Sequence, residues 1–165
     1  MVVETETLLF AAARSQLVSE VLQPALRSGE IVICDRFVDS SLAYQWGGRG
    51  LPLAEVQAVQ HLAVRECEPD LKILLDVPPL VAMARKSRGI DATNRFDDEA
   101  LAFHERVREA YISLAAAGPT QWQIIDAARD EDAVWRDVRE TIEQRGVLSI
   151  SGCADSFGSK HEEQH

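Results

Sequence analysis

The 165-residue sequence is short of positive charge. Lysine and arginine number 17 against 27 aspartate and glutamate residues, so the formal net charge is −10 and the isoelectric point is about 4.8. An acidic surface argues against nonspecific nucleic-acid binding through a broad basic patch, although a local group of arginines can still surround a phosphate. The longest apolar runs are much too short to span a membrane, so we expect no membrane partner.

Cysteine is also scarce. Cys34, Cys67 and Cys153 are scattered along the chain and odd in number. This pattern favours reduced structural thiols in a cytosolic protein over a disulfide framework or a zinc site. The four histidines do not form a metal-ligand constellation in the sequence. Residues 1–4 have no basic segment with an apolar region after it, so no secretory signal is visible and we expect a cytoplasmic protein.

The remaining composition is that of a globular protein. Apolar residues make up 46% of the chain, and the length points to one domain. Apolar residues at helical spacing predict helices at residues 7–26, 53–66, 80–88, 98–117 and 132–143. Short apolar runs predict buried strands at residues 31–34, 71–77 and 123–126. From Gly146 the periodicity ends, so we expect a domain at residues 1–145 and a disordered tail at 146–165.

The most informative stretch follows the predicted strand at residues 31–34. Ligands of open α/β sheets bind at the carboxyl ends of strands, so Asp35 and Arg36 are well placed for an anionic substrate. Ser41 and Gln45 are four residues apart, so one helical turn presents both side chains from one face. A strand end with a helix cap is the alternative, because surface Asp–Arg pairs are common. The glycines at residues 46–50 predict a flexible loop.

Several segments, in the same order, resemble motifs of the thymidylate kinase family. DRFVDSSLAYQ (35–45) resembles the DR-Y/F/H motif with its following helix, and ETLLFAAARSQ (6–16) resembles the thymidine-binding helix. Two later strands of the family are similar to PDLKILLDVPP (69–79) and IIDA (124–127). The lid-to-helix segment of the family is similar to NRFDDEALAFHERVREAYISLA (94–115). The resemblance runs from about residue 4 to about residue 145. It implies an α/β fold with a three-layer, P-loop kinase-like parallel sheet flanked by helices.

The resemblance implies a binding site for dTMP. Phe10 would stack on the thymine ring, and Arg14 would donate to a thymine carbonyl, which suits an aromatic platform and a planar cation. Ser41 and Gln45 would contact the thymine edge, while Tyr44 would shape the floor near the sugar. From the residues alone, the alternative is that Phe10 belongs to the core and Arg14 is a solvated charge.

The resemblance also implies phosphoryl transfer from ATP to dTMP, giving dTDP, with Mg²⁺ accompanying ATP. Arg36 would clamp the dTMP phosphate, and Asp35 would position the metal or the nucleophilic phosphate. Arg85, Arg88 and Arg95 would belong to a basic lid that stabilises the charge of the transferring phosphoryl group. The alternative for the first two is that positive charge at a helix C-terminus suits the helix dipole.

The sequence departs from the family pattern in two places. Thymidylate kinases begin with a strand and a phosphate loop of the G-x-x-x-x-G-K-[ST] type, and no such stretch occurs here. We therefore expect an incomplete sheet without its first two strands, in which the strands at 31–34 and 71–77 flank the place of the first. Three outcomes are then possible: the two strands pair directly with each other, a strand from another chain lies between them, or the protein is unstable. After the lid, Asn94 and Asp97 stand where many relatives carry an aspartate and a glutamate.

Three functional interpretations remain open. In the first, the chain is the larger part of a dTMP kinase and has no turnover of its own, because it lacks the phosphate loop. In the second, it is a non-catalytic module that binds a thymidine nucleotide or another partner. In the third, it is a nonfunctional remnant. The resemblance implies a homodimer built largely from the helices at 7–26 and 53–66. A complementing amino-terminal segment is a further expected partner. Upstream coding sequence for a glycine-rich loop would separate the first interpretation from the others.

Overall fold

A computed structural model describes residues 1–87 and 98–147 of the chain. The elements, in chain order, are α1 (Val3–Leu17), η1 (Val18–Leu22), α2 (Gln23–Arg27), α3 (Val38–Ser41), η2 (Leu42–Gly48), α4 (Leu53–Val64), β1 (Lys72–Asp76), α5 (Pro79–Ser87), α6 (Asp98–Ala117), β2 (Trp122–Asp126) and α7 (Glu131–Gln144). The two elements named η are π-helical. Within the described ranges, no helix has both the length and the apolarity needed to cross a membrane.

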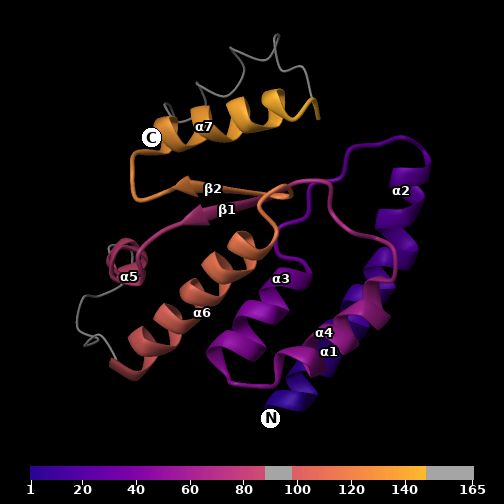
Figure 1. The fold of residues 1–165 in the computed structure, drawn as a ribbon, viewed down its shortest axis with the longest axis horizontal. Coiled ribbons are helices and arrows are strands. Elements are labelled where there is room, and N and C mark those ends of the chain that lie inside the picture. Colours follow the sequence, from indigo (N-terminus) through magenta and orange to yellow (C-terminus); the bar gives the residue numbers. More distant parts are fainter. Residues whose placement is uncertain (88–97, 148–165) are drawn as a thin grey trace, which may run out of the picture.

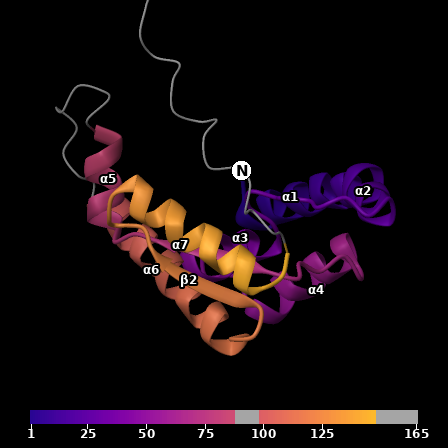
Figure 2. The ribbon, with the colours of Figure 1, turned by 90° about the horizontal axis from the view of Figure 1, so that it is seen from above.

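A small parallel sheet is sandwiched between helices. β1 and β2 pair in parallel, and their register places Asp76 opposite Asp126 at the carboxyl ends. Figures 1 and 2 show α7 on one face of this pair and α6 on the other. Trp122 and Ile125 of β2 are buried. The described part of the chain is therefore an α/β arrangement, as the sequence predicted, with a sheet of two strands.

The prediction of a strand at residues 31–34 is wrong. This segment connects α2 to α3 without strand pairing, and the side chain of Ile33 is 87% exposed. Val32 instead packs against the core between α1 and α4. A strand needs a hydrogen-bonded neighbour, and in the described residues β1 pairs with β2 alone. Direct pairing between residues 31–34 and β1, one of the expected outcomes, therefore does not occur.

The predicted helix at residues 7–26 is confirmed, with an earlier start. It continues through the π-helical turn η1 into α2, whose second residue is Pro24. Proline lacks an N–H and its ring crowds the carbonyl four residues earlier, so a widened turn accommodates it. The helix ends at Gly29, whose φ is +78°. Gly29 and Glu30 donate their N–H groups to carbonyls of the last turn at 3.0 and 3.1 Å, the Schellman arrangement that favours glycine.

The prediction of a flexible loop at residues 46–50 is wrong for its first half. η2 continues as a π-helix through Gly48 and packs against α6. A Cβ added to Gly47 would collide with the Cβ of Ala110, and one added to Gly48 would lie 2.5 Å from the ring of Phe103. These two glycines therefore permit close approach between helices, a role that composition alone does not separate from flexibility.

The inward face of α4 combines apolar residues with one amide. Val56 and Ala63 are buried, whereas Leu62 is 73% exposed. The inward position is occupied by Gln60, which is 1% exposed. Gln60 lies four residues after Val56 and three before Ala63, so the same helical spacing that buries those residues buries the amide.

Candidate functional site

One face of α1 carries Glu6, Phe10 and Arg14 at intervals of four residues, which aligns their side chains along the helix. The ends of this stripe are hydrogen-bonded to the helical segment formed by α3 and η2. Nη1 of Arg14 donates to Oγ of Ser41 at 3.1 Å, and Nε2 of Gln45 donates to Oε1 of Glu6 at 2.9 Å. Ser41 and Gln45 are themselves four residues apart. The fold therefore brings together Arg14, Ser41 and Gln45 from the predicted site, with Phe10 between the two bonds along α1.

Phe10 and Gln45 differ sharply in exposure. The Phe10 side chain is 52% exposed, so it is not part of the buried core formed by the described residues. An accessible aromatic face can serve as a stacking platform for a planar ligand. Gln45 is 2% exposed, and its Oε1 atom is buried without a hydrogen-bond partner among the described residues. An unpaired buried acceptor is uncommon in proteins and is a place where a bound donor would be stabilised.

Arg14 is held on several sides. Beyond its bond to Ser41, its Nη2 donates to the carbonyl oxygen of Phe37 at 3.0 Å, and its Nη1 donates to Oε1 of Gln60. The guanidinium also lies 5.7 Å from the centroid of the Phe37 ring. Burial lowers the pKa of Arg14, because removal from water disfavours the charged form. Arg14 is therefore an ordered, partly buried cation and not the freely solvated charge of the alternative interpretation.

The sequence prediction missed Glu6 and Gln60, which hold Gln45 and Arg14 respectively. The sequence contains only weak signals for the roles of these two residues. Glu6 precedes Phe10 by one helical turn, and Gln60 is a polar residue on the inward stripe of a helix. Both positions have common structural explanations, so only the contacts across helices reveal what these side chains touch.

The side chains of Arg36 and Tyr44 lie together. The Arg36 guanidinium is 5.5 Å from the centroid of the Tyr44 ring, a cation–π distance. Arg36 has a φ of +65°, a left-handed conformation that costs a non-glycine residue roughly 1–3 kcal/mol. Such strain is often found at binding sites.

Asp35 is exposed next to Arg36. In residues 1–87 and 98–147, no group of three or more His, Cys, Asp or Glu side chains could hold a metal ion. A single carboxylate is nevertheless compatible with Mg²⁺, which commonly binds one or two carboxylates together with substrate phosphates and water. The donor set around Asp35 therefore suits a metal that arrives with a phosphorylated ligand, and does not suit a structural metal centre.

Two polar contacts anchor α3, and with it this whole group. Nζ of Lys72 forms an ion pair with Oδ1 of Asp39 at 3.1 Å, which connects α3 to β1. Oγ of Ser40 and the hydroxyl of Tyr111 lie 2.7 Å apart, which connects α3 to α6. Burial raises the pKa of the Tyr111 phenol. Tyr111 thus orients the segment that carries Ser41.

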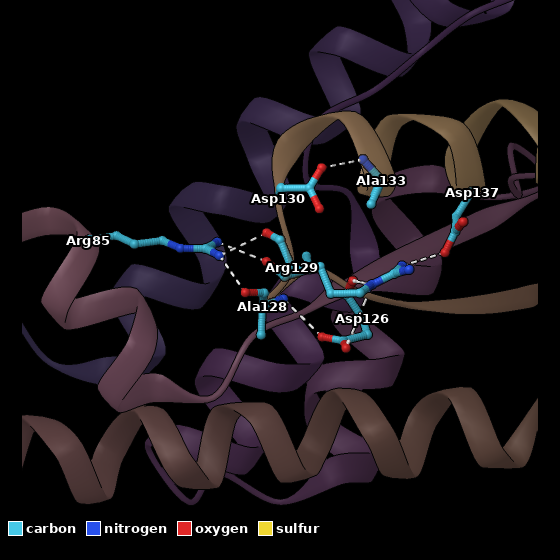
Figure 3. Close-up of polar contacts among 8 residues, drawn as sticks. Arg85, Asp126, Ala128, Arg129, Asp130, Ala133 and Asp137 are labelled. Atoms are coloured by element: carbon cyan, nitrogen blue, oxygen red, sulfur yellow. Dashed lines mark hydrogen bonds and ion pairs between the residues drawn. The ribbon is translucent and has the colours of Figure 1, made fainter.

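Arg85 lies in a different part of the molecule. Figure 3 shows its guanidinium facing the loop after β2, where Nη1 donates to the carbonyl of Ala127 at 2.8 Å. Its Nη2 donates to the carbonyls of Ala128 and Arg129 at 2.9 and 3.2 Å. In Figures 1 and 2, α5 lies at the left of the molecule and α1 runs from the middle to the right. The structure therefore does not bring Arg85 to the group around Arg14.

The loop that Arg85 caps is itself well ordered by polar contacts (Figure 3). Arg129 donates to Asp137 and forms an ion pair with Asp126, with Nε and Oδ2 3.7 Å apart. The carboxylate of Asp130 accepts from the N–H of Ala133 at 2.9 Å and so caps the N-terminus of α7. Arg85 thus binds three successive carbonyl groups of this loop, which is a structural use of its charge in this conformation.

Asp76 has an architectural role. Its two carboxylate oxygens accept from Nε and Nη2 of Arg108 at 2.7 and 2.6 Å, a paired geometry that connects β1 to α6. These hydrogen bonds raise the pKa of Arg108. The predicted lid residues Arg88 and Arg95, together with Asn94 and Asp97, lie outside the described residues.

Comparison with known proteins gives a consistent result. A sequence model of the family described as thymidylate kinase matches residues 1–138. The chain is 46% identical over 154 residues to the thymidylate kinase of Desulforudis audaxviator (strain MP104C), covering 91% of this chain and 68% of that protein. It is 45% identical over 145 residues to that of Thermomicrobium roseum (strain ATCC 27502 / DSM 5159 / P-2), covering 86% and 69%. Against that of Afipia carboxidovorans (strain ATCC 49405 / DSM 1227 / KCTC 32145 / OM5), identity is 42% over 144 residues, covering 86% and 63%. The chain thus spans about two thirds of the length of these relatives.

Proposed function

The chain belongs to the thymidylate kinase family, and we propose that it carries the thymidine-nucleotide half of an enzyme that transfers a phosphoryl group from ATP to dTMP, giving dTDP. One observation supports this above the others. Two hydrogen bonds between α1 and the α3–η2 segment bring Arg14, Ser41 and Gln45 together, one from Arg14 to Ser41 and one from Gln45 to Glu6. Charged and amide groups held in this way can read the polar edge of a planar base.

In this proposal the base lies against α1. Phe10 offers its exposed ring for stacking, and Arg14 donates to a carbonyl of thymine. Ser41 and Gln45 contact the edge of the base, and Tyr44 forms the floor near the sugar. The accessibility of Phe10 and the unpaired Oε1 of Gln45 support these assignments, because each is a group that gains a partner when a base binds.

The phosphate end of the substrate is assigned to the strained segment before α3. Arg36 binds the dTMP phosphate, as a guanidinium can donate two parallel hydrogen bonds to it. Asp35 holds Mg²⁺, which accompanies ATP and whose charge stabilises the transferring phosphoryl group when bound. Arg85, Arg88 and Arg95 are assigned to the ATP side. Arg85 would have to leave its carbonyl partners to act there.

A homodimer belongs to the same proposal. Apolar side chains of α1 and α4 remain exposed, including Leu8 at 58%, Leu9 at 57% and Leu62 at 73%. Residues of this kind on adjacent helices suit a helix-packed interface between two copies. A complementing amino-terminal segment with a phosphate loop is the second partner that we propose, because the sequence presented here contains none.

Calorimetric titration with dTMP tests the proposal. The wild-type chain should bind dTMP, and Arg14→Ala should weaken binding by roughly 1–3 kcal/mol, the scale of a lost hydrogen bond to a charged group. Arg27→Ala is a matched control, since Arg27 is an exposed arginine at the end of α2 that donates only to its own helix in the contacts described. Equal dTMP affinity in the wild type and Arg14→Ala would contradict the assignment of Arg14.

A further inference from the structure

Gln60 occupies an unusual position for an amide. Its side chain is 1% exposed between α4 and α1, where Oε1 accepts from Nη1 of Arg14. Its Nε2 atom is buried with no hydrogen-bond partner among the described residues. A buried donor without a partner destabilises the folded state, so stability alone does not favour a glutamine at this position. An apolar side chain would fill the same space without that cost.

The side-chain and backbone groups that accept hydrogen bonds from Arg14 are all neutral. They are the hydroxyl of Ser41, the carbonyl of Phe37 and the amide oxygen of Gln60. In the described residues, no carboxylate forms an ion pair with Arg14. The nearby carboxylate of Asp39 is instead paired with Lys72. Arg14 is thus fixed in place without having its charge neutralised.

We propose that Gln60 is a positioning residue, which orients the Arg14 guanidinium through a neutral acceptor and so keeps its full charge for a carbonyl oxygen of a pyrimidine base. This inference rests on the proposed function of Arg14. A carboxylate at position 60 would hold the guanidinium equally well, but would form an ion pair that competes with the ligand. Oriented but uncompensated charge gives the strongest hydrogen bond to a neutral acceptor.

The proposal predicts opposite effects of Gln60→Glu on stability and on binding. The variant removes the unpaired Nε2 donor and adds an ion pair with Arg14, so its unfolding midpoint should equal or exceed that of the wild type. Its affinity for dTMP should nevertheless fall about tenfold or more, equivalent to ~1.4 kcal/mol. A residue with a merely structural role would lose stability and affinity together, or neither.

Two further variants make the test specific. Gln57→Glu adds the same charge to an exposed glutamine of the same helix, so it should leave dTMP affinity within about twofold of the wild type. Gln60→Met has a similar volume but no acceptor, and should weaken dTMP binding while keeping the fold. Titration with thymidine in place of dTMP should give the same order of variants, since the effect acts at the base and not at the phosphate.

Calorimetry of the full chain, paired with thermal unfolding, separates the outcomes. Wild-type affinity in both Gln60 variants, alongside weakened binding in Arg14→Ala, would overturn the role of Gln60 and leave the proposed function standing. Absence of dTMP binding by the folded wild type would overturn both. If Gln60→Glu does not fold, Gln60→Met decides, and wild-type affinity in that variant refutes the inference.

Discussion

Replacement of Gly47 by alanine should disturb the contact between η2 and α6. The added Cβ would collide with the Cβ of Ala110 and would lie 3.3 Å from the carbonyl oxygen of Arg106. Neither neighbour can turn aside, because a methyl group has no alternative rotamer and a helix carbonyl is held by the backbone. The two helical segments must therefore separate, which also disturbs the bond from Arg106 to the carbonyl of Gly48.

The size of the effect follows from two opposing terms. Overpacking costs roughly 1–3 kcal/mol, and rigid neighbours place Gly47→Ala near the upper end of that range. Alanine is favoured over glycine in a helix by about 1 kcal/mol, which offsets part of the cost. We expect a net loss of ~2 kcal/mol, which lowers the unfolding midpoint by roughly 4–8 °C in a chain of this size. Gly48→Ala should also destabilise the protein, since its added Cβ would lie 2.5 Å from the Phe103 ring and 2.8 Å from Cγ2 of Val107.

Thermal unfolding followed by circular dichroism measures both variants. Gly118→Ala is the control, because its added Cβ would lie 3.5 Å from the Trp122 ring, an ordinary contact distance. That variant should melt close to the wild type. A Gly47→Ala protein that melts at or above the wild-type temperature would refute the reasoning, because it would mean that η2 and α6 do not depend on glycine for their approach.

Two further predictions concern the remainder of the chain. Asp130→Ala removes the cap of α7, so it should lower the free energy of unfolding by about 1 kcal/mol in a urea titration, and an unchanged midpoint would contradict that role. Residues 1–165 alone should not phosphorylate dTMP in a coupled assay with ATP and Mg²⁺, because they contain no G-x-x-x-x-G-K stretch to hold the ATP phosphates. Turnover of about 1–1000 per second, the usual enzyme range, would contradict this prediction.

Elements with strong local signals were predictable from the sequence. The helical periodicity between residues 7 and 26 predicted the α1–α2 segment, which ends at Gly29 in the left-handed conformation that glycine readily adopts. The apolar runs that became β1 and β2 were also predicted, within a residue at each end. The helix forms through hydrogen bonds within its own segment, and each of the two strands has the other as its neighbour in the described residues.

Elements that depend on distant partners were not predictable in the same way. Residues 31–34 have the composition of a buried strand, yet Ile33 is exposed because the described residues provide no strand beside it. The glycine-rich segment at residues 46–50 has the composition of a flexible loop, yet its Gly47 lies in a helix packed against Ala110. Composition limits the conformations that a segment can adopt, whereas the residues packed against it determine which conformation it takes.

By itself, the sequence determined the order of the helices and strands and, through motifs that resemble a known family, the candidate residues Phe10, Arg14, Ser41 and Gln45. Only the tertiary structure decided which groups hold those side chains. Glu6 and Gln60 contact Gln45 and Arg14 across helix interfaces, and no spacing along the chain encodes a hydrogen bond between residues 39 or 46 positions apart. Hydrogen bonding depends on distance in space, and the packing of α1 against α4 and η2 sets that distance.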